Sequence, residues 1–420
     1  MIARMTKRNP GRNALLFIFI TVLINMIGFG VIMPVMPDLI MEVTEEGRAE
    51  AARWGGLLTM AYALMQFVMM PVIGSLSDRF GRRPIILCSL CAYSLDFLLM
   101  ALAPSLAALL IARILAGAFS ATFSTANAYI ADISPPEKRA ANFGLMGAAF
   151  GLGFIIGPAL GGLVGDAFGH RAPFFAVAGL GVLNLVYGLI FLPETLAPEN
   201  RREFDWRRSN AIGTFRYFRQ YPVILPIAAA TLLYQLAHWT FPSVWAYYAG
   251  LRFGWSAKDI GVSLMAVGLA SAIVQGGLSR IVIPRIGERR AAFFGAGIAI
   301  VTYAGYGLVD EGWMIYPLIA IGALGGFTTP SLQGIMSRTV PSDAQGQLQG
   351  AIGSINGVSM IIGPTMMTQI FAAFSRDDAV IAFPGAPFML ASLLTATAMI
   401  PLFAAIGRVQ RPRAAAPSAL

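Results

Sequence analysis

Runs of about 20 apolar residues recur along the whole length of this 420-residue chain, separated by short polar links. A helical run of that length crosses the hydrocarbon core of a bilayer. Because hydrocarbon offers the backbone no hydrogen-bond partners, a crossing segment has to satisfy its own peptide groups as a helix. Only 12% of the residues are charged, too few to solvate a globular surface of this size. The sequence therefore predicts an all-α polytopic membrane protein.

We expect about twelve transmembrane helices, counted from the apolar runs. Their ranges are 14–40, 50–75, 84–104, 106–131, 140–165, 171–192, 221–250, 256–280, 290–309, 313–337, 345–373 and 386–407. With both ends of the chain placed in the cytoplasm, the inner segments hold 23 of the 30 Lys and Arg residues. Short basic loops stay on the cytoplasmic side, so we expect both termini there.

The net charge of +9 would suit a nucleic-acid partner, but the basic residues are interspersed among the spans. Anionic lipid at the cytoplasmic face is the expected partner instead of nucleic acid. The chain has no Gly-x-x-x-x-Gly-Lys-Ser/Thr phosphate loop and no His/Cys/Asp cluster with metal-ligand spacing. We therefore expect no cofactor, no metal and no enzymatic activity, and we interpret Cys88 and Cys91 as core thiols.

A short charged link, Gly74 to Pro84, joins the second and third expected spans. Its charged side chains stay in water, and its two glycines permit a tight backbone. An aspartate beside arginines at two helix ends can latch those ends together, although such a link also acts as a topology signal. The latch candidates are Gly74, Asp78, Arg79, Gly81, Arg82 and Arg83.

The chain repeats itself at a constant offset of 206 residues, which places Gly81 on Gly287 and Pro158 on Pro364. Six spans separate the copies, so both halves cross the membrane in the same direction. Such a parallel duplication is expected of two six-helix bundles around a central cavity. We predict bundles over 1–192 and 221–420, joined by a cytoplasmic linker over 193–220.

Two formally charged residues, Asp96 and Arg113, lie well inside expected spans. A charge at that depth costs at least about 2 kcal/mol, so it needs a partner or a purpose. Both residues lie at a similar distance from the turn near Pro104, so we expect them to be able to pair. The pair is either a static contact between helices or a site that takes up and releases protons. A static buried pair contributes little stability, which favours the proton site.

His238 lies about midway along the seventh expected span, where Trp239 follows it. A neutral imidazole can relay protons or bind a ligand, and it can equally be a satisfied packing residue. An aromatic wall such as Trp239 suits a lipophilic or cationic ligand. Polar side chains on other spans are either helix–helix contacts or ligand contacts. They are Asn25, Gln66, Gln275, Gln333 and Asn356.

The fifth expected span carries glycines at a spacing of four residues. A face without side chains lets a neighbouring backbone approach closely, and the proline in this span can kink the helix. Tight packing and a rocking contact between the two halves are compatible roles for this stretch. Its key residues are Gly151, Gly157, Pro158, Gly161 and Gly162.

These stretches resemble the signature motifs of the major facilitator superfamily. The Gly74–Pro84 link resembles the loop between helices two and three, and Gly30–Pro37 resembles the first-helix motif of the twelve-helix drug/proton antiporters. Arg113-Ile-Leu-Ala-Gly117 resembles their fourth-helix motif, and Gly151–Gly162 resembles their fifth-helix antiporter motif. The resemblance covers nearly the whole chain and implies two parallel six-helix repeats.

Ala63–Phe67 and Gly346–Gly350 are closer still to the tetracycline/proton antiporter branch. That branch carries acids at the positions of Asn25 and Ala299 and a histidine at the position of Ser271, whereas its third-span acid remains as Asp96. The resemblance therefore implies a proton site without the metal–tetracycline site, and a different amphipathic substrate.

The resemblance implies a proton-coupled secondary transporter that exports a small amphipathic drug or metabolite by alternating access. We expect a functional monomer in a bacterial inner membrane, with a small-molecule substrate, protons and membrane lipid as partners. Asp96, Arg113 and His238 are the proton-coupling candidates. The expected substrate contacts are Asn25, Gln66, His238, Trp239, Gln275, Gln333 and Asn356. The alternatives are a proton-coupled importer of a small metabolite and a non-transporting signalling or scaffold protein.

The predicted topology is testable at the link between the halves, because residues 193–221 hold six Lys and Arg residues. A single cysteine at Asn200, with Cys88 and Cys91 replaced, is expected to resist an impermeant thiol reagent applied outside whole cells. Labelling after the cells are opened is the control for reactivity. Rapid labelling of intact cells would reverse the orientation.

Overall fold

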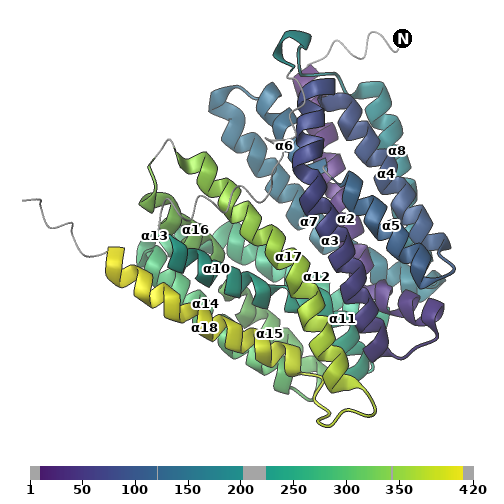
Figure 1. Cartoon of the computed structure of the whole chain (residues 1–420), viewed down its shortest axis with the longest axis vertical. Helices are drawn as coiled ribbons and strands as arrows, with labels where there is room; N and C mark the ends of the chain where they lie inside the picture. Colours follow the sequence, from purple (N-terminus) through teal and green to yellow (C-terminus); the bar gives the residue numbers. More distant parts are fainter. Residues whose placement is uncertain (1–9, 121, 202–223, 342–343, 410–420) are drawn as a thin grey trace, which may run out of the picture. The chain divides into compact units, whose positions relative to one another are not determined.

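The computed structural model describes residues 10–120, 122–201, 224–341 and 344–409. Within these ranges the chain is helical and contains no strand (Figure 1). The first half contains α2 (Pro10–Thr44), α3 (Arg48–Phe80), α4 (Arg82–Leu102), α5 (Leu106–Phe119), α6 (Thr122–Ile133), α7 (Pro136–Phe168), α8 (Ala172–Phe191) and η1 (Pro198–Asn200). The second half contains α10 (Leu225–His238), α11 (Thr240–Arg252), α12 (Ala257–Ile273), η3 (Val274–Leu278), α13 (Ser279–Ile286), α14 (Glu288–Leu308), η4 (Gly312–Met314), α15 (Ile315–Gly322), η5 (Ala323–Phe327), α16 (Thr328–Thr339), α17 (Gln345–Ser375) and α18 (Ala386–Val409).

Eleven stretches of the described chain are helical, long and apolar enough to cross a membrane. This finding confirms the predicted all-α polytopic class. The remaining expected span, 221–250, corresponds to α10 and α11, of 14 and 13 residues, which are separated at Trp239. Neither piece is long enough to cross a bilayer alone.

Several expected spans contain a local change of helix type. The fourth is divided into α5 and α6, the eighth contains the π-helical segment η3, and the tenth contains the 3₁₀ segment η5. Residue periodicity does not reveal such changes, because they alter which backbone carbonyl accepts each hydrogen bond and leave the apolar run unchanged.

The chain forms two compact units. The first unit comprises residues 1–211 and 245–268, and the second comprises 212–244 and 269–420, so the boundaries fall within α11 and α12 as well as in the link. Most of the predicted linker, 202–220, lies outside the described residues. The division into six-helix bundles over 1–192 and 221–420 therefore remains a prediction.

In the first unit, α2 and α7 meet along a seam of glycines. A side chain added at Gly157 would lie 2.5 Å from the Ile27 carbonyl oxygen and 2.9 Å from the Gly30 Cα. One turn further on, a Cβ at Gly161 would lie 2.8 Å from the Val31 carbonyl oxygen. The glycine spacing therefore brings the two backbones into contact, as predicted for this face.

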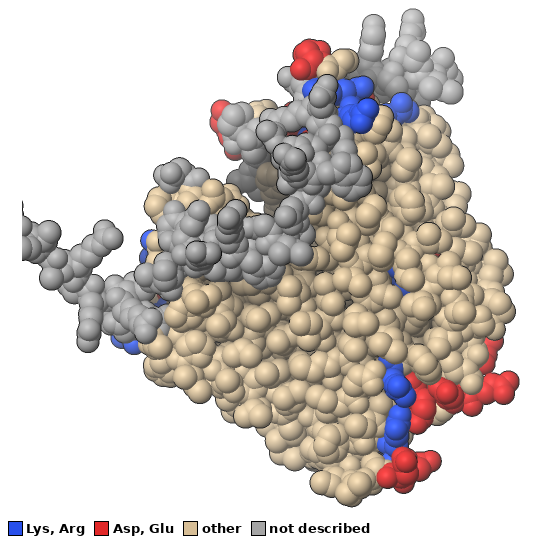
Figure 2. Space-filling model, in the orientation of Figure 1, with Lys and Arg blue, Asp and Glu red and all other residues tan. Residues whose placement is uncertain are grey.

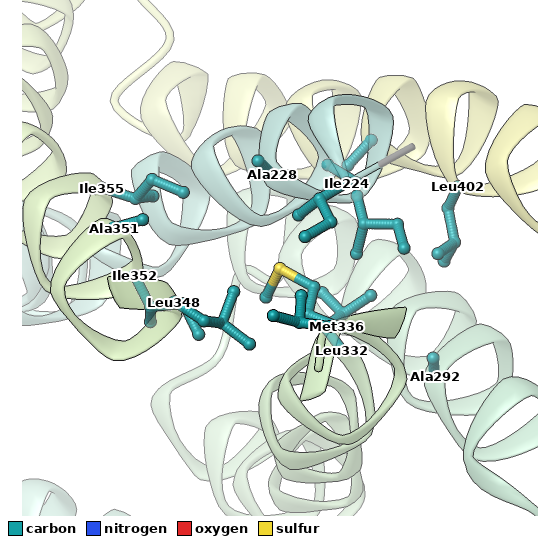
Figure 3. Packing of buried hydrophobic residues seen from close by; sticks show 14 of the residues in the cluster. Ile224, Ala228, Ala292, Leu332, Met336, Leu348, Ala351, Ile352, Ile355 and Leu402 are labelled. Carbon is teal, nitrogen blue, oxygen red and sulfur yellow. The ribbon is translucent and has the colours of Figure 1, made fainter. Parts of the chain in front are cut away.

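The second unit is built around a cluster of buried apolar side chains from α10, α14, α16, α17 and α18 (Figure 3). Met336 and Leu332 lie at its centre, and Leu348 and Ile352 reach it from α17. Since lipid is as apolar as these side chains, their contribution to stability comes from close packing more than from burial.

The local structure follows the 206-residue offset. Gly81 joins α3 to α4 with φ of 105°, and Gly287 joins α13 to α14 with φ of 81°. Both angles lie in the left-handed region that favours glycine. Pro158 lies inside α7 and its counterpart Pro364 lies inside α17. The duplication predicted from the sequence is thus present in the backbone conformation.

Charged side chains on the face shown in Figure 2 gather toward the ends of helices and leave a broad uncharged surface between them. An uncharged belt is the surface that hydrocarbon requires. Cys88 and Cys91 lie on α4 and are exposed. The prediction that they are core thiols was wrong, because an apolar side chain on a membrane helix can face outward at no cost.

The α2–α7 seam predicts the effect of a bulky residue at its closest point. Replacing Gly157 by Leu should separate the helices and destabilise the protein by about 1–3 kcal/mol, as overpacking generally does. Gly147→Leu on the same helix is the matched control, because a Cβ at Gly147 meets no atom within 4 Å. The measurement is the thermal unfolding midpoint in detergent, and equal midpoints for both variants would contradict the seam.

Candidate functional site

A buried ion pair links α4 to α5 in the first unit. The Arg113 guanidinium donates to Oδ2 of Asp96, and the two residues are 7% and 5% exposed. The turn between the helices brings them to the same depth, and Ser105 caps α5 by accepting a hydrogen bond from the Ala108 N–H at 3.4 Å. The pairing predicted from the sequence is therefore present.

The ion pair is incompletely satisfied. Among the described residues, neither Oδ1 of Asp96 nor Nε of Arg113 has a hydrogen-bond partner. The Arg113 guanidinium also lies 5.5 Å from the centroid of the Tyr62 ring, within cation–π range. Buried charges normally use all of their donors and acceptors, so a free carboxylate oxygen at this depth marks a place where a proton can bind.

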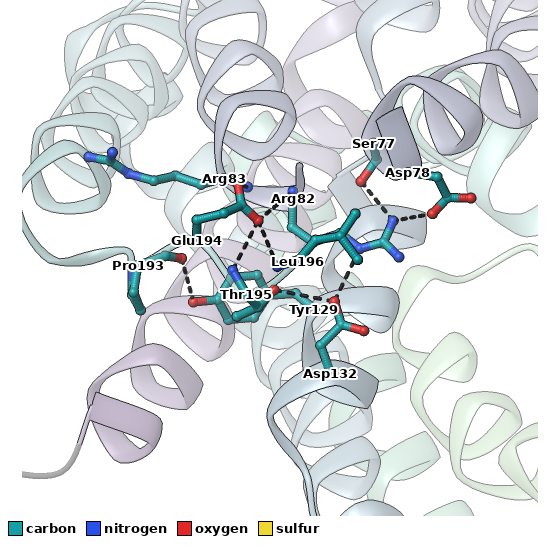
Figure 4. A network of polar contacts seen from close by, with 10 residues as sticks. All are labelled: Ser77, Asp78, Arg82, Arg83, Tyr129, Asp132, Pro193, Glu194, Thr195 and Leu196. Carbon is teal, nitrogen blue, oxygen red and sulfur yellow. Dashed lines mark hydrogen bonds and ion pairs between the residues drawn. The ribbon is translucent and has the colours of Figure 1, made fainter. Parts of the chain in front are cut away.

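A second polar site, which we call the latch network, consists of Ser77, Asp78, Arg82, Asp132 and Glu194 (Figure 4). The Arg82 guanidinium donates to Asp78 at 2.6 Å, to Ser77 at 3.0 Å and to Asp132 at 3.2 Å. It thereby joins the end of α3 to the end of α6. The link between the second and third spans therefore places one arginine between two acids.

Glu194 completes the latch network and was missed by the sequence analysis. Its carboxylate accepts from the backbone N–H groups of Arg82 at 2.9 Å and Arg83 at 3.1 Å, which caps the start of α4 (Figure 4). Arg82 and Arg83 place positive charge at the positive end of the α4 dipole, so a nearby carboxylate is stabilising there. The signal was available, because Glu194 lies two residues after the sixth expected span while α4 begins with no acid of its own.

The other latch candidates have different surroundings. The Arg83 guanidinium donates to the Leu189 carbonyl at 2.8 Å, which ties α4 to α8. Arg79 lies over the ring of Phe80 at 5.2 Å. A Cβ at Gly74 would meet only the Ser124 hydroxyl, at 3.9 Å. Asp78, Arg82, the backbone at Arg83 and Gly81, which lies against the Glu194 carboxylate, are thus the candidates brought together in the network.

The antiporter stretch on α7 also contacts α12 within the first unit. A Cβ at Gly162 would lie 2.5 Å from the Ala257 carbonyl and 3.1 Å from the Gly261 Cα. Gly261 in turn faces the Pro158 carbonyl. Gly151 differs from these positions, because a Cβ there meets nothing within 4 Å. The stretch therefore has a backbone-to-backbone partner, Gly261, that its own sequence did not reveal.

Two of the expected substrate contacts lie in the first unit. The Asn25 side chain donates to the Thr21 carbonyl of its own helix at 2.8 Å. Gln66 is half-buried on α3. Among the described residues, neither amide forms a hydrogen bond with the buried ion pair.

The remaining substrate candidates lie in the second unit. Gln235 on α10 donates to Asn356 on α17 at 2.7 Å, and the sequence analysis had singled out only the second of these. His238 is exposed, and Gln333 is half-buried. Gln275 lies in the π-helical segment η3 and faces Gly326 of η5. No group of three or more His, Cys, Asp or Glu residues in the described chain is placed to hold a metal ion.

The second unit contains a counterpart of the Arg82–Asp132 pair with reversed charges. Glu288, at the start of α14, accepts from Arg338 near the end of α16 at 2.9 Å. The 206-residue offset places Glu288 on Arg82 and Arg338 on Asp132. Because Glu288 is itself acidic, α14 needs no separate capping acid at its positive end.

The opposite end of the first unit carries a charged cluster that the sequence analysis did not identify. Arg171 donates to Glu42 at 3.1 Å and to the carbonyls of Ala101 and Ala103 at 2.8 and 2.9 Å. His170 also contacts Glu42. Arginine at the last carbonyls of α4 complements the negative end of its dipole, so both ends of α4 are capped by charge.

The Glu194 cap predicts a local loss of stability when its carboxylate is removed. Glu194→Ala should accelerate amide hydrogen exchange at Arg82 and Arg83, corresponding to a loss of about 0.5–2 kcal/mol of capping energy. Glu199→Ala is the control, because Glu199 is exposed and lies outside the latch network. Unchanged exchange in the first variant would show that solvent caps α4 equally well.

The chain is similar to known proteins over most of its length. The family model for the Major Facilitator Superfamily matches residues 18–364. The chain is 39% identical over 361 residues to the class C tetracycline resistance protein of Escherichia coli, covering 86% of this chain and 90% of the relative. It is 34% identical to the class B protein of Escherichia coli, with coverage of 83% and 86%.

Solved structures share the fold at lower identity. A bacterial homolog of the human lysosomal transporter Spinster, inward-facing and unoccupied, aligns with a TM-score of 0.74 at 18% identity and covers 95% of this chain and 96% of its own. The human organic anion transporter MFSD10 aligns with a TM-score of 0.68 at 21% identity, covering 94% and 100%. Together with the family match, these findings show that the chain is a transporter of the Major Facilitator Superfamily, related to the tetracycline resistance proteins.

Proposed function

We propose that this transporter exports a small amphipathic compound in exchange for protons, by alternating access across a bacterial inner membrane. It would act as a monomer with both termini in the cytoplasm. The single observation that carries the proton coupling is the buried Asp96–Arg113 pair with its unpartnered carboxylate oxygen. The similarity to tetracycline resistance proteins supports export over import.

The pair offers a direct way to couple a proton to a conformational change. When Asp96 is ionised, it neutralises the Arg113 guanidinium with which it pairs. When Asp96 binds a proton, that attraction is lost and the helices gain freedom to move apart. A transporter needs only such a difference in affinity between its two states to exchange protons for substrate.

The latch network and the glycine seams supply the elements that alternating access requires. Ion pairs at helix ends can favour one state and re-form in the other. Backbone contacts such as those of Gly162 with Gly261 let packed helices shift without side chains interlocking. Asp78 would act through Arg82 in this scheme, as a positioning residue.

The substrate we favour is an amphipathic compound other than a metal–tetracycline complex. Asn25 replaces the first-span acid of the tetracycline exporters, and its amide is bonded to the Thr21 carbonyl of its own helix. A site for a cationic metal complex benefits from a carboxylate at that position. The aromatic and amide side chains of the second unit suit a neutral or weakly basic compound.

The coupling role is testable by comparing two variants for substrate-driven proton flux in inverted vesicles. Asp96→Asn should reduce the proton flux at least about tenfold while equilibrium substrate binding survives. The amide keeps the shape of the aspartate side chain but cannot bind and release a proton. His238→Gln should retain flux. Full coupling in the first variant with none in the second would assign the proton to His238 instead.

A control is needed because removing one partner of a buried pair leaves an uncompensated charge, which costs about 3–5 kcal/mol. The double variant Asp96→Asn with Arg113→Gln removes both charges and should restore the unfolding midpoint without restoring flux. Restored flux in the double variant would contradict the proposed proton site. The direction of flux separates export from import of a metabolite.

A further inference from the structure

Three contacts along one face of α5 hold the aromatic ring of Tyr62, on α3, over the Arg113 guanidinium. The guanidinium carbon lies 5.5 Å from the centroid of the ring. The Tyr62 backbone lies against Gly117, where an added Cβ would be 2.3 Å from the Tyr62 carbonyl oxygen. The Tyr62 hydroxyl is hydrogen-bonded to the side chain of Ser120. The ring is therefore held at its backbone, at its face and at its hydroxyl.

The direction of the bond to Ser120 follows from the number of protons. A serine hydroxyl has one proton to donate. That of Ser120 goes to the Gly117 carbonyl at 2.9 Å. The Tyr62 hydroxyl is therefore the donor to Ser120, and the group that Tyr62 presents to Arg113 is the face of its ring.

The same contacts account for the spacing between Arg113 and Gly117. These residues lie one turn apart on α5, so both face the same neighbour. A Cβ at Gly117 would also lie 2.9 Å from the Met65 Cβ, so α3 comes this close only because the position has no side chain. The glycine therefore brings the Tyr62 ring within reach of the arginine.

Binding a proton to Asp96 changes the balance of charge around Arg113. Oδ2 of Asp96 accepts from the guanidinium, whereas Oδ1 has no partner among the described residues, so a proton can bind at Oδ1 without displacing the arginine. The ion pair then becomes a hydrogen bond between a cation and a neutral acid. Arginine keeps its charge in proteins. The negative face of the Tyr62 ring is then the group on α3 that stabilises the cation.

A second tyrosine lies near the same acid. Tyr62 and Tyr93 each interact electrostatically with both Asp96 and Arg113. Tyr93 lies on α4, one turn before Asp96, and its hydroxyl donates to the Ile24 carbonyl of α2 at 2.7 Å. The helix that carries the acid is thus tied to α2, whereas the helix that carries the arginine is tied to α3.

We propose that Tyr62 is a positioning residue for the proton site, which keeps Arg113 with α3 when Asp96 binds its proton. Protonation then weakens the contact between α4 and α5 and leaves the contact between α3 and α5 in place, so α4 is the helix that is released. The inference rests on the proposed proton coupling and deepens it. Loss of one helix contact on protonation gives the two states of the transporter different affinities for the proton.

The test is an infrared titration of the Asp96 carboxyl in the full-length protein in detergent, with the Asp96 band identified by its absence from Asp96→Asn. Tyr62→Leu removes the ring and should shift the titration midpoint by about 0.5–1 pH unit to the acid side. The shift has this sign because the ring stabilises the arginine most when Asp96 is neutral. It corresponds to a proton affinity about three- to tenfold lower.

Two variants serve as matched controls. Tyr62→Phe keeps the ring and should keep the wild-type midpoint. Phe67→Leu removes an aromatic ring five residues further along α3, about 140° around the helix from Tyr62, and should also leave the midpoint unchanged.

A series of increasingly fluorinated phenylalanines at position 62 separates the charge of the ring face from its shape. Fluorine withdraws negative charge from the face while the ring stays in place. The midpoint should therefore fall stepwise along the series, which a purely structural role of the ring would not produce. The series also provides the test if Tyr62→Leu does not fold.

Equal midpoints in Tyr62→Leu and Tyr62→Phe, or a fluorinated series without a trend, would overturn the inference. So would an Asp96 carboxyl that does not titrate while the protein is folded. The titration involves no transport, so it is independent of the flux measured with Asp96→Asn. Unshifted midpoints with flux lost in Asp96→Asn would remove the role of Tyr62 alone. Shifted midpoints with full flux in Asp96→Asn would remove the proposed coupling alone and leave Tyr62 as a group that sets the protonation of Asp96.

Discussion

Hydrocarbon cannot accept or donate hydrogen bonds, and this constraint accounts for most of the structure. Backbone groups are satisfied inside helices, and small hydroxyls bond back to their own helix, as Thr231 does to the Ile227 carbonyl and Thr395 to the Ala391 carbonyl. Charged side chains lie at helix ends or form ion pairs with one another. The Asp96–Arg113 pair is incompletely satisfied among the described residues, and its unpartnered carboxylate oxygen is why we propose a functional role there.

The two repeats solve one electrostatic problem in different ways. A helix that begins with a basic residue opposes its own dipole, and α4 begins with Arg82 and Arg83. Glu194 supplies the missing negative charge from beyond α8. In the second repeat, Glu288 starts α14 and takes both roles, capping by charge and pairing with Arg338. The reversed pair preserves the link between spans while removing the need for an additional acid.

The repeats also differ in how their helices pack at the seams. Glycines bring α2 and α7 into backbone contact, which favours rigid packing. At the matching position in the second unit, Gly363 faces the side chain of Trp239, and Gln235 of α10 bonds Asn356 of α17. The matching helix pairs are therefore held by backbone contacts in one copy and carry a hydrogen-bonded amide pair in the other.

The sequence by itself indicated the class, eleven of the twelve expected spans, the duplication and the possibility that Asp96 pairs with Arg113. These follow from local rules, because an apolar run, a φ-positive glycine or a charge at a given depth depends on nearby residues alone. Tertiary structure alone decided that Glu194 caps α4, that Gly261 faces Gly162 and that Gln235 bonds Asn356. Those partners are distant in sequence, and an apolar run does not specify which other segment will pack against it. Periodicity therefore carries no information on these contacts.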